Sequence, residues 1–249
     1  MIYLTQIEVS GESDAGPFAG ILPLSPGLQV ISARNSYGKS LAIKAVPWCL
    51  GVEPIFGIRN NEPTCFPGAV TDELALPNNP AAHIVSSECS ITLRRENGDE
   101  VRLTRAIKGD PTYVLVEERY NGNIRSTKLQ ARRDTMHDER GGLQRFLFSW
   151  FSWPRVEVST FRGINAEVYL ENLVPSFYID QDEGWTDLQA LQISRYGQQQ
   201  ITEIAVEYLL GATESIKARV ARQQADQKAQ QLRDRAREIA DRVGQAFLM

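Results

Sequence analysis

The sequence predicts an α/β fold organised around a phosphate-binding loop, and three features of the chain support this prediction. A short apolar run over residues 27–32 precedes a Gly-Lys-Ser motif, and a helix-forming segment over 41–51 follows it. Alternating apolar and polar residues over 83–128 predict a meander of antiparallel strands. The segment 214–247 has no proline and has apolar residues at spacings of three and four, which predicts one long helix.

The loop matches the usual pattern of Gly, any four residues, Gly-Lys and then Ser or Thr, except that Ala33 replaces the first glycine. Gly38 would let the backbone approach phosphate oxygens, Lys39 would reach the β- and γ-phosphates, and the Ser40 hydroxyl would bind Mg²⁺. If position 33 needs a positive φ, alanine is strained there by about 1–2 kcal/mol. The candidate nucleotide-binding residues are Ala33, Arg34, Asn35, Ser36, Tyr37, Gly38, Lys39, Ser40 and Leu41.

Composition and charge narrow the possible classes of protein but do not identify one. The chain has 249 residues with 42% apolar residues and a net charge of −4, which suits one large or two small globular domains and gives no overall sign of nucleic-acid binding. From Glu214 onward, however, eight Lys and Arg face five Asp and Glu, so this part has a net charge of +3 and could meet DNA. Three widely spaced cysteines fit neither a zinc site nor a disulfide framework.

The N-terminus lacks the basic start and the apolar core of a signal peptide, and the sequence has no apolar run long enough to span a membrane. With the unpaired cysteines, this favours a reducing cytoplasmic location.

The N-terminal part reads as two antiparallel strands over 1–9 and 18–24, joined by a turn-rich loop over 10–17. Five prolines make 52–82 an irregular insertion, with one short helix expected at 72–76. Strands are expected at 89–95, 100–107, 112–117 and 124–128, with tight turns at Asn97-Gly98 and at 120–123.

The C-terminal part is expected to be mainly helical. Helices are predicted over 142–151 and 202–210, and a short helix followed by an apolar strand over 166–181, ending at Gln181. The final helix over 214–247 would span about 50 Å. Its thin apolar stripe fits either a weak coiled coil, favoured by its length, or a lone surface helix.

The order of these parts resembles the N-terminal half of an SMC/Rad50-type ATP-binding-cassette head. Asn35 stands where that family's loop has its usual Asn, Gln181 matches the glutamine of its Q-loop, and the final helix matches the root of its long coiled coil. Within the family, three segments look like the SMC-like subunit of bacterial Lamassu-type anti-phage and anti-plasmid systems. They are Phe-Pro-Gly-Ala-Val-Thr-Asp at 66–72, Asp-Gln-Asp-Glu-Gly-Trp at 180–185 and Ala-Val-Glu-Tyr-Leu-Leu at 205–210.

The resemblance implies a half-head over 1–212 and a coiled-coil root over 213–249. It implies an ATPase that uses ATP and Mg²⁺, with Lys39 and Gln181 as catalytic residues and Ser40 and Gln181 as Mg²⁺ contacts. Implied partners are a second head in a homodimer, DNA, and accessory or effector subunits such as a nuclease. The family's Leu-Ser-Gly-Gly-type signature and Asp-Glu strand do not occur in this sequence, and Arg-Gly-Gly-Leu at 140–143 is no substitute. The sequence therefore looks like a fragment whose hydrolysis needs a C-terminal half.

Several basic residues are further candidates. Arg59 lies 20 residues after Lys39, at the spacing of a regulatory arginine in some such heads, although a solvated loop arginine is the plainer interpretation. The arginines at 94, 95, 102 and 105 fit a solvated sheet face, with Arg102 and Arg105 on opposite faces. Candidate DNA contacts at the start of the final helix are Lys217, Arg219 and Arg222. The four tryptophans are expected in the core.

Other functions remain open. The chain could be an ATPase of the DNA-repair type related to RecF and RecN, or a nucleotide-binding scaffold that signals by dimerising and hardly hydrolyses. It could also be an unrelated small kinase, although the long terminal helix disfavours this alternative.

Overall fold

The computed structural model describes residues 1–32, 38–56, 65–75, 81–131, 142–163, 165–179 and 197–246. The chain divides into two compact units, Met1–Trp153 and Pro154–Met249. Each unit is described by itself below.

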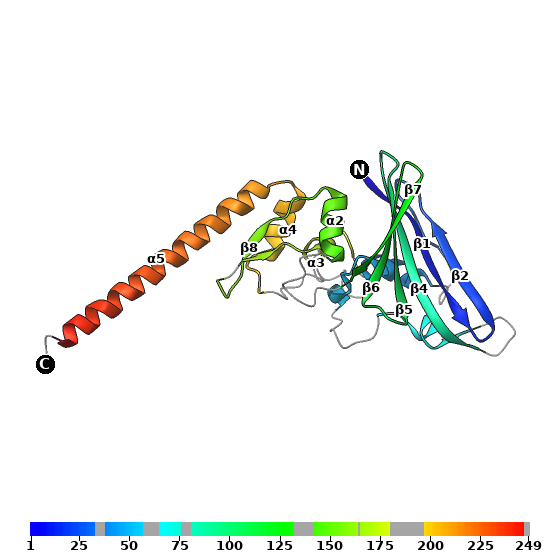
Figure 1. Ribbon diagram of the computed structural model, residues 1–249, viewed down its shortest axis with the longest axis horizontal. Helices are drawn as coiled ribbons and strands as arrows, with labels where there is room; N and C mark the ends of the chain where they lie inside the picture. The colour runs from blue at the N-terminus through cyan, green and yellow to red at the C-terminus, as the bar shows by residue number, and fades with distance from the viewer. Residues whose placement is uncertain are drawn as a thin grey trace. The chain divides into compact units, whose positions relative to one another are not determined.

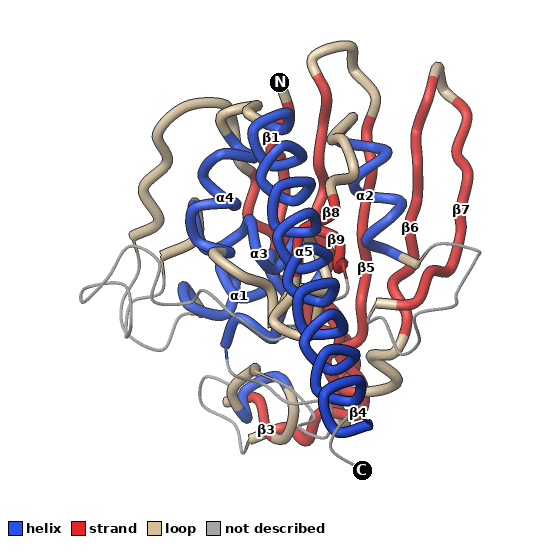
Figure 2. Tube along the Cα trace, turned by 90° about the vertical axis from the view of Figure 1, so that its left-hand side faces the viewer, coloured by secondary structure: helices blue, strands red, loops and turns tan. Residues whose placement is uncertain are grey.

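The first unit is built on an antiparallel sheet with the strand order β2-β1-β4-β5-β6-β7 (Figure 1). Figure 2 shows β5, β6 and β7 side by side. A further short strand, β3, pairs with the start of β4. The strands are β1 (Ile2–Ser13), β2 (Gly16–Pro23), β3 (Glu73–Leu74), β4 (Ala82–Arg95), β5 (Glu100–Lys108), β6 (Tyr113–Tyr120) and β7 (Asn123–Gln130).

The predicted meander is confirmed, and its turn residues explain it. Asn97 and Gly98 lie in the turn between β4 and β5, where the Asn97 side chain accepts a hydrogen bond from the Asp99 backbone at 3.2 Å. Asn121 and Gly122, with φ of 48° and 82°, form the turn between β6 and β7. Two consecutive positive φ values match the right-handed twist of a hairpin, which is why Asn-Gly is favoured there.

One face of this sheet forms the core of the first unit. Ile91 and Leu93 of β4, Leu103 of β5, and Val114 and Val116 of β6 are buried on it. Helix α1 (Lys39–Cys49) packs on β1, β4 and β5. Helix α2 (Leu143–Phe151) confirms the predicted helix at 142–151 and buries Leu143, Leu147 and Trp150.

The first unit departs from the sequence predictions in three places. The segment 24–32 forms no strand, and the side chains of Leu28 and Val30 are 93% and 82% exposed. An apolar run forms a buried strand only when a neighbouring strand pairs with it, and none does among the described residues. The first strand runs on to Ser13, because it pairs with both β2 and β4 along this length. The helix expected at 72–76 is wrong: a single 3₁₀ turn at Gly68–Val70 leads into β3.

The described residues of the second unit form the hairpin β8 (Glu157–Ser159) and β9 (Asn165–Glu167), the α-helices α3 (Leu170–Leu173), α4 (Ile201–Leu209) and α5 (Thr213–Ala246), and a 3₁₀ turn at Val174–Ser176. Helices α4 and α5 confirm the two predicted C-terminal helices. Residues 177–179 form no strand, and Phe177 and Ile179 are 58% and 60% exposed, so the described part of the apolar strand expected before Gln181 is wrong. Helix α5 packs on α4 and β8 through its first turns, where Ile216 and Val220 are buried.

Candidate functional site

Helix α1 begins directly after Gly38, whose backbone lies in the left-handed region with φ 77° and ψ 14°. A side chain with a Cβ is strained in this conformation, so the motif places its glycine where the backbone requires one. Lys39 is half-buried and Ser40 is exposed in the first turn. This turn contains no acidic residue, and the unpaired N–H groups of a helix start favour an anion.

Some of the candidate residues are not placed. Gly38, Lys39, Ser40 and Leu41 lie together at the start of α1. The other residues of the expected site lie outside the described residues: Ala33, Arg34, Asn35, Ser36, Tyr37, Arg59 and Gln181.

The other end of α1 is fixed to the sheet by polar contacts. The indole N–H of Trp48 donates to the carbonyl oxygen of Ala106 on β5 at 3.0 Å. The thiol of Cys49 donates to the carbonyl oxygen of Cys89 on β4 at 3.4 Å, and the two Sγ atoms are 3.5 Å apart. Burial raises the pKa of Cys89 well above its ordinary value, so this thiol stays protonated. The helix that carries Lys39 and Ser40 is therefore held at its C-terminal end by both β4 and β5.

Arg105 of β5 is the most connected side chain behind this helix. Its Nη1 and Nη2 donate to Oε2 and Oε1 of Glu53 at 2.8 and 2.9 Å, and both side chains are buried. Its Nη1 also donates to the carbonyl oxygen of Trp48, and its Nε to that of Pro111, each at 2.8 Å. The guanidinium lies 4.2 Å from the centre of the Trp48 ring. One arginine thus joins β5, the end of α1 and the 3₁₀ turn Glu53–Phe56.

The expectation that these arginines lie on a solvated sheet face is wrong for Arg105, which is buried. The expectation that Arg102 and Arg105 lie on opposite faces is confirmed. Arg102 lies on the other face, where it pairs with Glu8 at 3.0 Å. Arg105 lies on the same face of β5 as Val101, Leu103 and Ile107, all of which are buried. This spacing was the available signal, because a side chain in step with three buried ones must share their face.

Of the four tryptophans, Trp48 and Trp150 lie in the core as expected, Trp153 is half-buried, and Trp185 lies outside the described residues.

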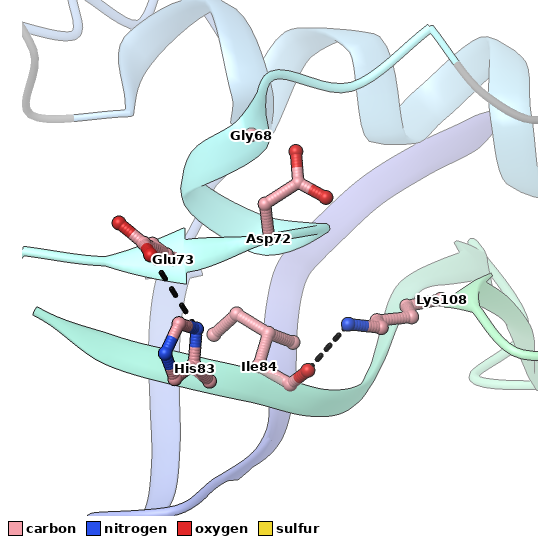
Figure 3. Close-up of a pocket in the computed structure, with 6 residues that line it drawn as sticks. All are labelled: Gly68, Asp72, Glu73, His83, Ile84 and Lys108. Atoms are coloured by element: carbon pink, nitrogen blue, oxygen red, sulfur yellow. Dashed lines mark hydrogen bonds and ion pairs between the residues drawn. The ribbon is translucent and has the colours of Figure 1, made fainter.

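A cleft of about 530 Å³ beside β3 gathers Asp72, Glu73, His83 and Lys108 (Figure 3). Glu73 pairs with Nδ1 of His83 at 3.4 Å, and Asp72 accepts a hydrogen bond from Thr71 at 3.2 Å. The Lys108 ammonium donates to the carbonyl oxygen of Ile84 (Figure 3). Across the described ranges, no three His, Cys, Asp or Glu side chains form a group that could hold a metal ion. The Glu73–His83 pair thus joins β3 to β4, and the Lys108 contact joins β5 to β4.

The candidate DNA contacts on α5 do not form one patch. The Lys217 ammonium pairs with Glu214 at 2.6 Å, and Arg219 pairs with Glu207 of α4. Lys217 and Arg219 are about 200° apart around the helix axis. Arg222 is exposed. Two of the three charges are therefore matched by carboxylates within the chain.

Comparison with protein-family models finds no family that matches this chain, and comparison with curated proteins finds no match either. Within the ranges that the structure covers, no helix combines the length and apolar character needed to cross a membrane.

Proposed function

We propose that this chain binds ATP–Mg²⁺ at the loop before α1 and forms the nucleotide-binding half of an SMC-type ATPase head. The observation that carries the proposal is the left-handed backbone of Gly38 immediately before a helix that starts with Lys39 and Ser40. This geometry suits a loop that presents backbone N–H groups and a lysine ammonium to phosphate oxygens, and a hydroxyl to Mg²⁺.

The exposed apolar side chains in the segment before the loop support the proposal that a complementary half of the head completes this fold. Leu28 and Val30 are almost fully exposed, although burial of apolar surface stabilises by about 25 cal/mol per Å². A strand from the complementary half would pair with this segment and cover both side chains. In this proposal hydrolysis requires that half and a homodimer of complete heads, in which Gln181 contacts Mg²⁺ and the attacking water.

The long helix supports a coiled coil that leaves the head. Helix α5 has 34 residues, and Leu232 and Ile239 are 58% and 63% exposed. These two positions are seven residues apart, the heptad spacing at which apolar side chains meet a partner helix. We extend the proposal to a role in sensing DNA within a bacterial Lamassu-type defence complex, together with an effector such as a nuclease. The sequence resemblance supports this finer part, and the exposed Arg222 is its strongest DNA-contact candidate on α5.

Lys39→Ala tests the loop, and Lys44→Ala is a matched control on the same helix. Titration of the full chain with a fluorescent ATP analogue and Mg²⁺ should show at least tenfold weaker binding for Lys39→Ala, because a charged phosphate contact is lost. Lys44, whose ammonium lies over the Phe56 ring at 5.8 Å, should be replaceable without this loss. Equal affinity in the Lys39 variant and the parent would refute the proposal. Fast ATP turnover by these 249 residues alone would contradict the need for a second half.

A further inference from the structure

Strand β2 lies at one edge of the sheet in the first unit (Figure 1). It pairs with β1, and no other described strand pairs with its second side. Its eight residues include no charged side chain, and Ile21 is 61% exposed. The strand at the opposite edge, β7, has Arg125 and Lys128, and such charges protect an edge from pairing with another chain. Of the two edges, β2 is therefore the one without this protection.

The direction of each backbone group of β2 follows from its register with β1. The N–H of Leu24 donates to the carbonyl oxygen of Thr5 at 2.8 Å, and these two residues continue the register in which Pro23 lies opposite Gln6. In an antiparallel ladder, hydrogen-bonded pairs of this kind alternate with pairs that exchange no bond. The even-numbered residues of β2 therefore bond to β1. The odd-numbered residues direct their backbone groups to the open edge, and they are Pro17, Ala19, Ile21 and Pro23.

The hydrogen-bond donors along this open edge are arranged symmetrically. Pro17 and Pro23 have no backbone N–H, so Ala19 and Ile21 supply the donors, and Gly20 lies midway between them. This order of donors is the same when the strand is read in either direction. Two copies can therefore pair antiparallel about a two-fold axis at Gly20, with Ala19 of each copy opposite Ile21 of the other. Each of these pairs exchanges both of its hydrogen bonds, so every donor on the edge finds an acceptor.

Gly20 gives a second, independent indication of a close neighbour. Within the described part of the chain nothing requires a glycine there, because its φ is not positive and a Cβ would meet only the Val9 carbonyl oxygen at 4.0 Å. A glycine inside a strand weakens the strand, and it often marks a place where another backbone approaches closely. In the symmetric pairing Gly20 faces its own copy in a pair without hydrogen bonds, in which the Cα atoms are about 4.5 Å apart.

We propose that β2 joins a second copy of this chain edge to edge, so that the two sheets form one continuous antiparallel sheet. Ala19 and Ile21 lie on the same face of β2, so the pairing packs Ile21 of each copy against Ala19 of the other. No charged side chain of β2 has to lose water when the edges meet. This contact is separate from the homodimer of complete heads in the proposed function, because it needs neither nucleotide nor a C-terminal half.

The test is the mass of the full chain in solution without nucleotide, measured by sedimentation equilibrium at micromolar to submillimolar concentrations. Every protein in the comparison carries Leu232→Ser/Ile239→Ser, so that pairing through the exposed apolar positions of α5 does not contribute. Ala19→Pro removes one edge donor from each copy, and an edge strand tolerates proline where its N–H would point outward. The matched control Ala19→Ser keeps this N–H.

A second variant, Ile21→Lys, does not depend on the tolerance of proline. It places an ammonium group at an exposed position of each copy, where the two like charges would lie close across the axis. Its matched control is Val85→Lys on the inner strand β4, since the Val85 side chain is 64% exposed. The melting temperature of each variant shows whether it is folded.

We expect the parent to form a dimer whose dissociation constant rises about tenfold in Ala19→Pro, because two of the four edge hydrogen bonds are lost. Ile21→Lys should weaken the dimer at least as much, and both controls should stay within about twofold of the parent. A monomer at every concentration, a dimer that Ile21→Lys leaves intact, or equal losses in the variants and their controls would each overturn the proposal. If Ala19→Pro is unfolded, Ile21→Lys and its control decide the outcome.

Discussion

Arg105 and Glu53 form a two-point ion pair in the core of the first unit, with N–O distances of 2.8 and 2.9 Å and exposed fractions of 2% and 0%. Two charges are removed from water there, and this is tolerable only because nearly every donor of the guanidinium meets an acceptor. The pair therefore contributes more to fixing the position of α1 than to net stability.

Replacing Arg105 by Leu should lower the free energy of unfolding by about 3–5 kcal/mol, because Glu53 would be left buried without its partner. The double variant Arg105→Leu/Glu53→Leu should be less destabilised than the single one. Urea unfolding followed by circular dichroism measures both. The control Arg119→Leu removes an arginine that is 61% exposed and should cost less than about 1 kcal/mol. If Arg105→Leu were as stable as Arg119→Leu, the buried Glu53 would not depend on its pair with Arg105.

Gly38→Ala should weaken nucleotide binding and lower stability by about 1–2 kcal/mol, because alanine is strained at φ 77°. Thermal unfolding and nucleotide titration measure the two effects. Gly20→Ala in β2 is the control, since a Cβ there would meet only a backbone oxygen at 4.0 Å. A loss of stability in the Gly20 variant equal to that of Gly38→Ala would argue against a special backbone at position 38.

The thiol of Cys65 gives the first unit a pH-dependent contribution to stability. Burial is the main cause that raises its pKa from 9.0 to about 11. The folded chain therefore holds this proton more tightly than the unfolded chain, so the contribution is complete below pH 9 and is lost as the pH rises towards 11. Melting temperatures between pH 8 and 11 should fall less steeply for Cys65→Ser than for the parent. If the melting temperatures of Cys65→Ser and the parent fell equally with pH, the raised pKa of Cys65 would not be the cause. The buried Cys89 remains in both proteins.

Leu28→Ser and Val30→Ser together should change the free energy of unfolding by less than about 0.5 kcal/mol, as expected for exposed positions. The control Ile91→Ala removes a fully buried side chain and should cost about 2–5 kcal/mol. Urea unfolding compares the two. A large effect of the Ser variants would mean that the segment before the loop is packed in the isolated chain.

The parts of the fold that depend on local sequence were predictable. The alternation of apolar and polar residues over 89–107 specifies paired strands, and Asn-Gly at 121–122 specifies a tight hairpin turn. Both signals are local, so they predict the meander without knowledge of the rest of the fold. Helix α5 follows from its unbroken helical spacing. The lack of a strand at 27–32 could not be predicted in the same way, because an apolar run becomes a strand only beside another strand. The motif correctly placed Gly38, Lys39 and Ser40 at the start of a helix. The burial of Arg105 was missed, because it follows from the pattern of the whole strand, in which three residues on the same face are buried.

Helix α5 also has a mechanical consequence. Its buried and hydrogen-bonded contacts run from Ile216 and Val220 to Gln224, whose amide donates to the Asn165 side chain at 3.2 Å, and the helix extends about 33 Å beyond them. A rotation of about 5° at this packed base would move the far end by about 3 Å, given that length. The base of α5 would thus be the pivot of a lever arm, in which a small shift against α4 and β8 becomes a displacement of several ångströms at the far end.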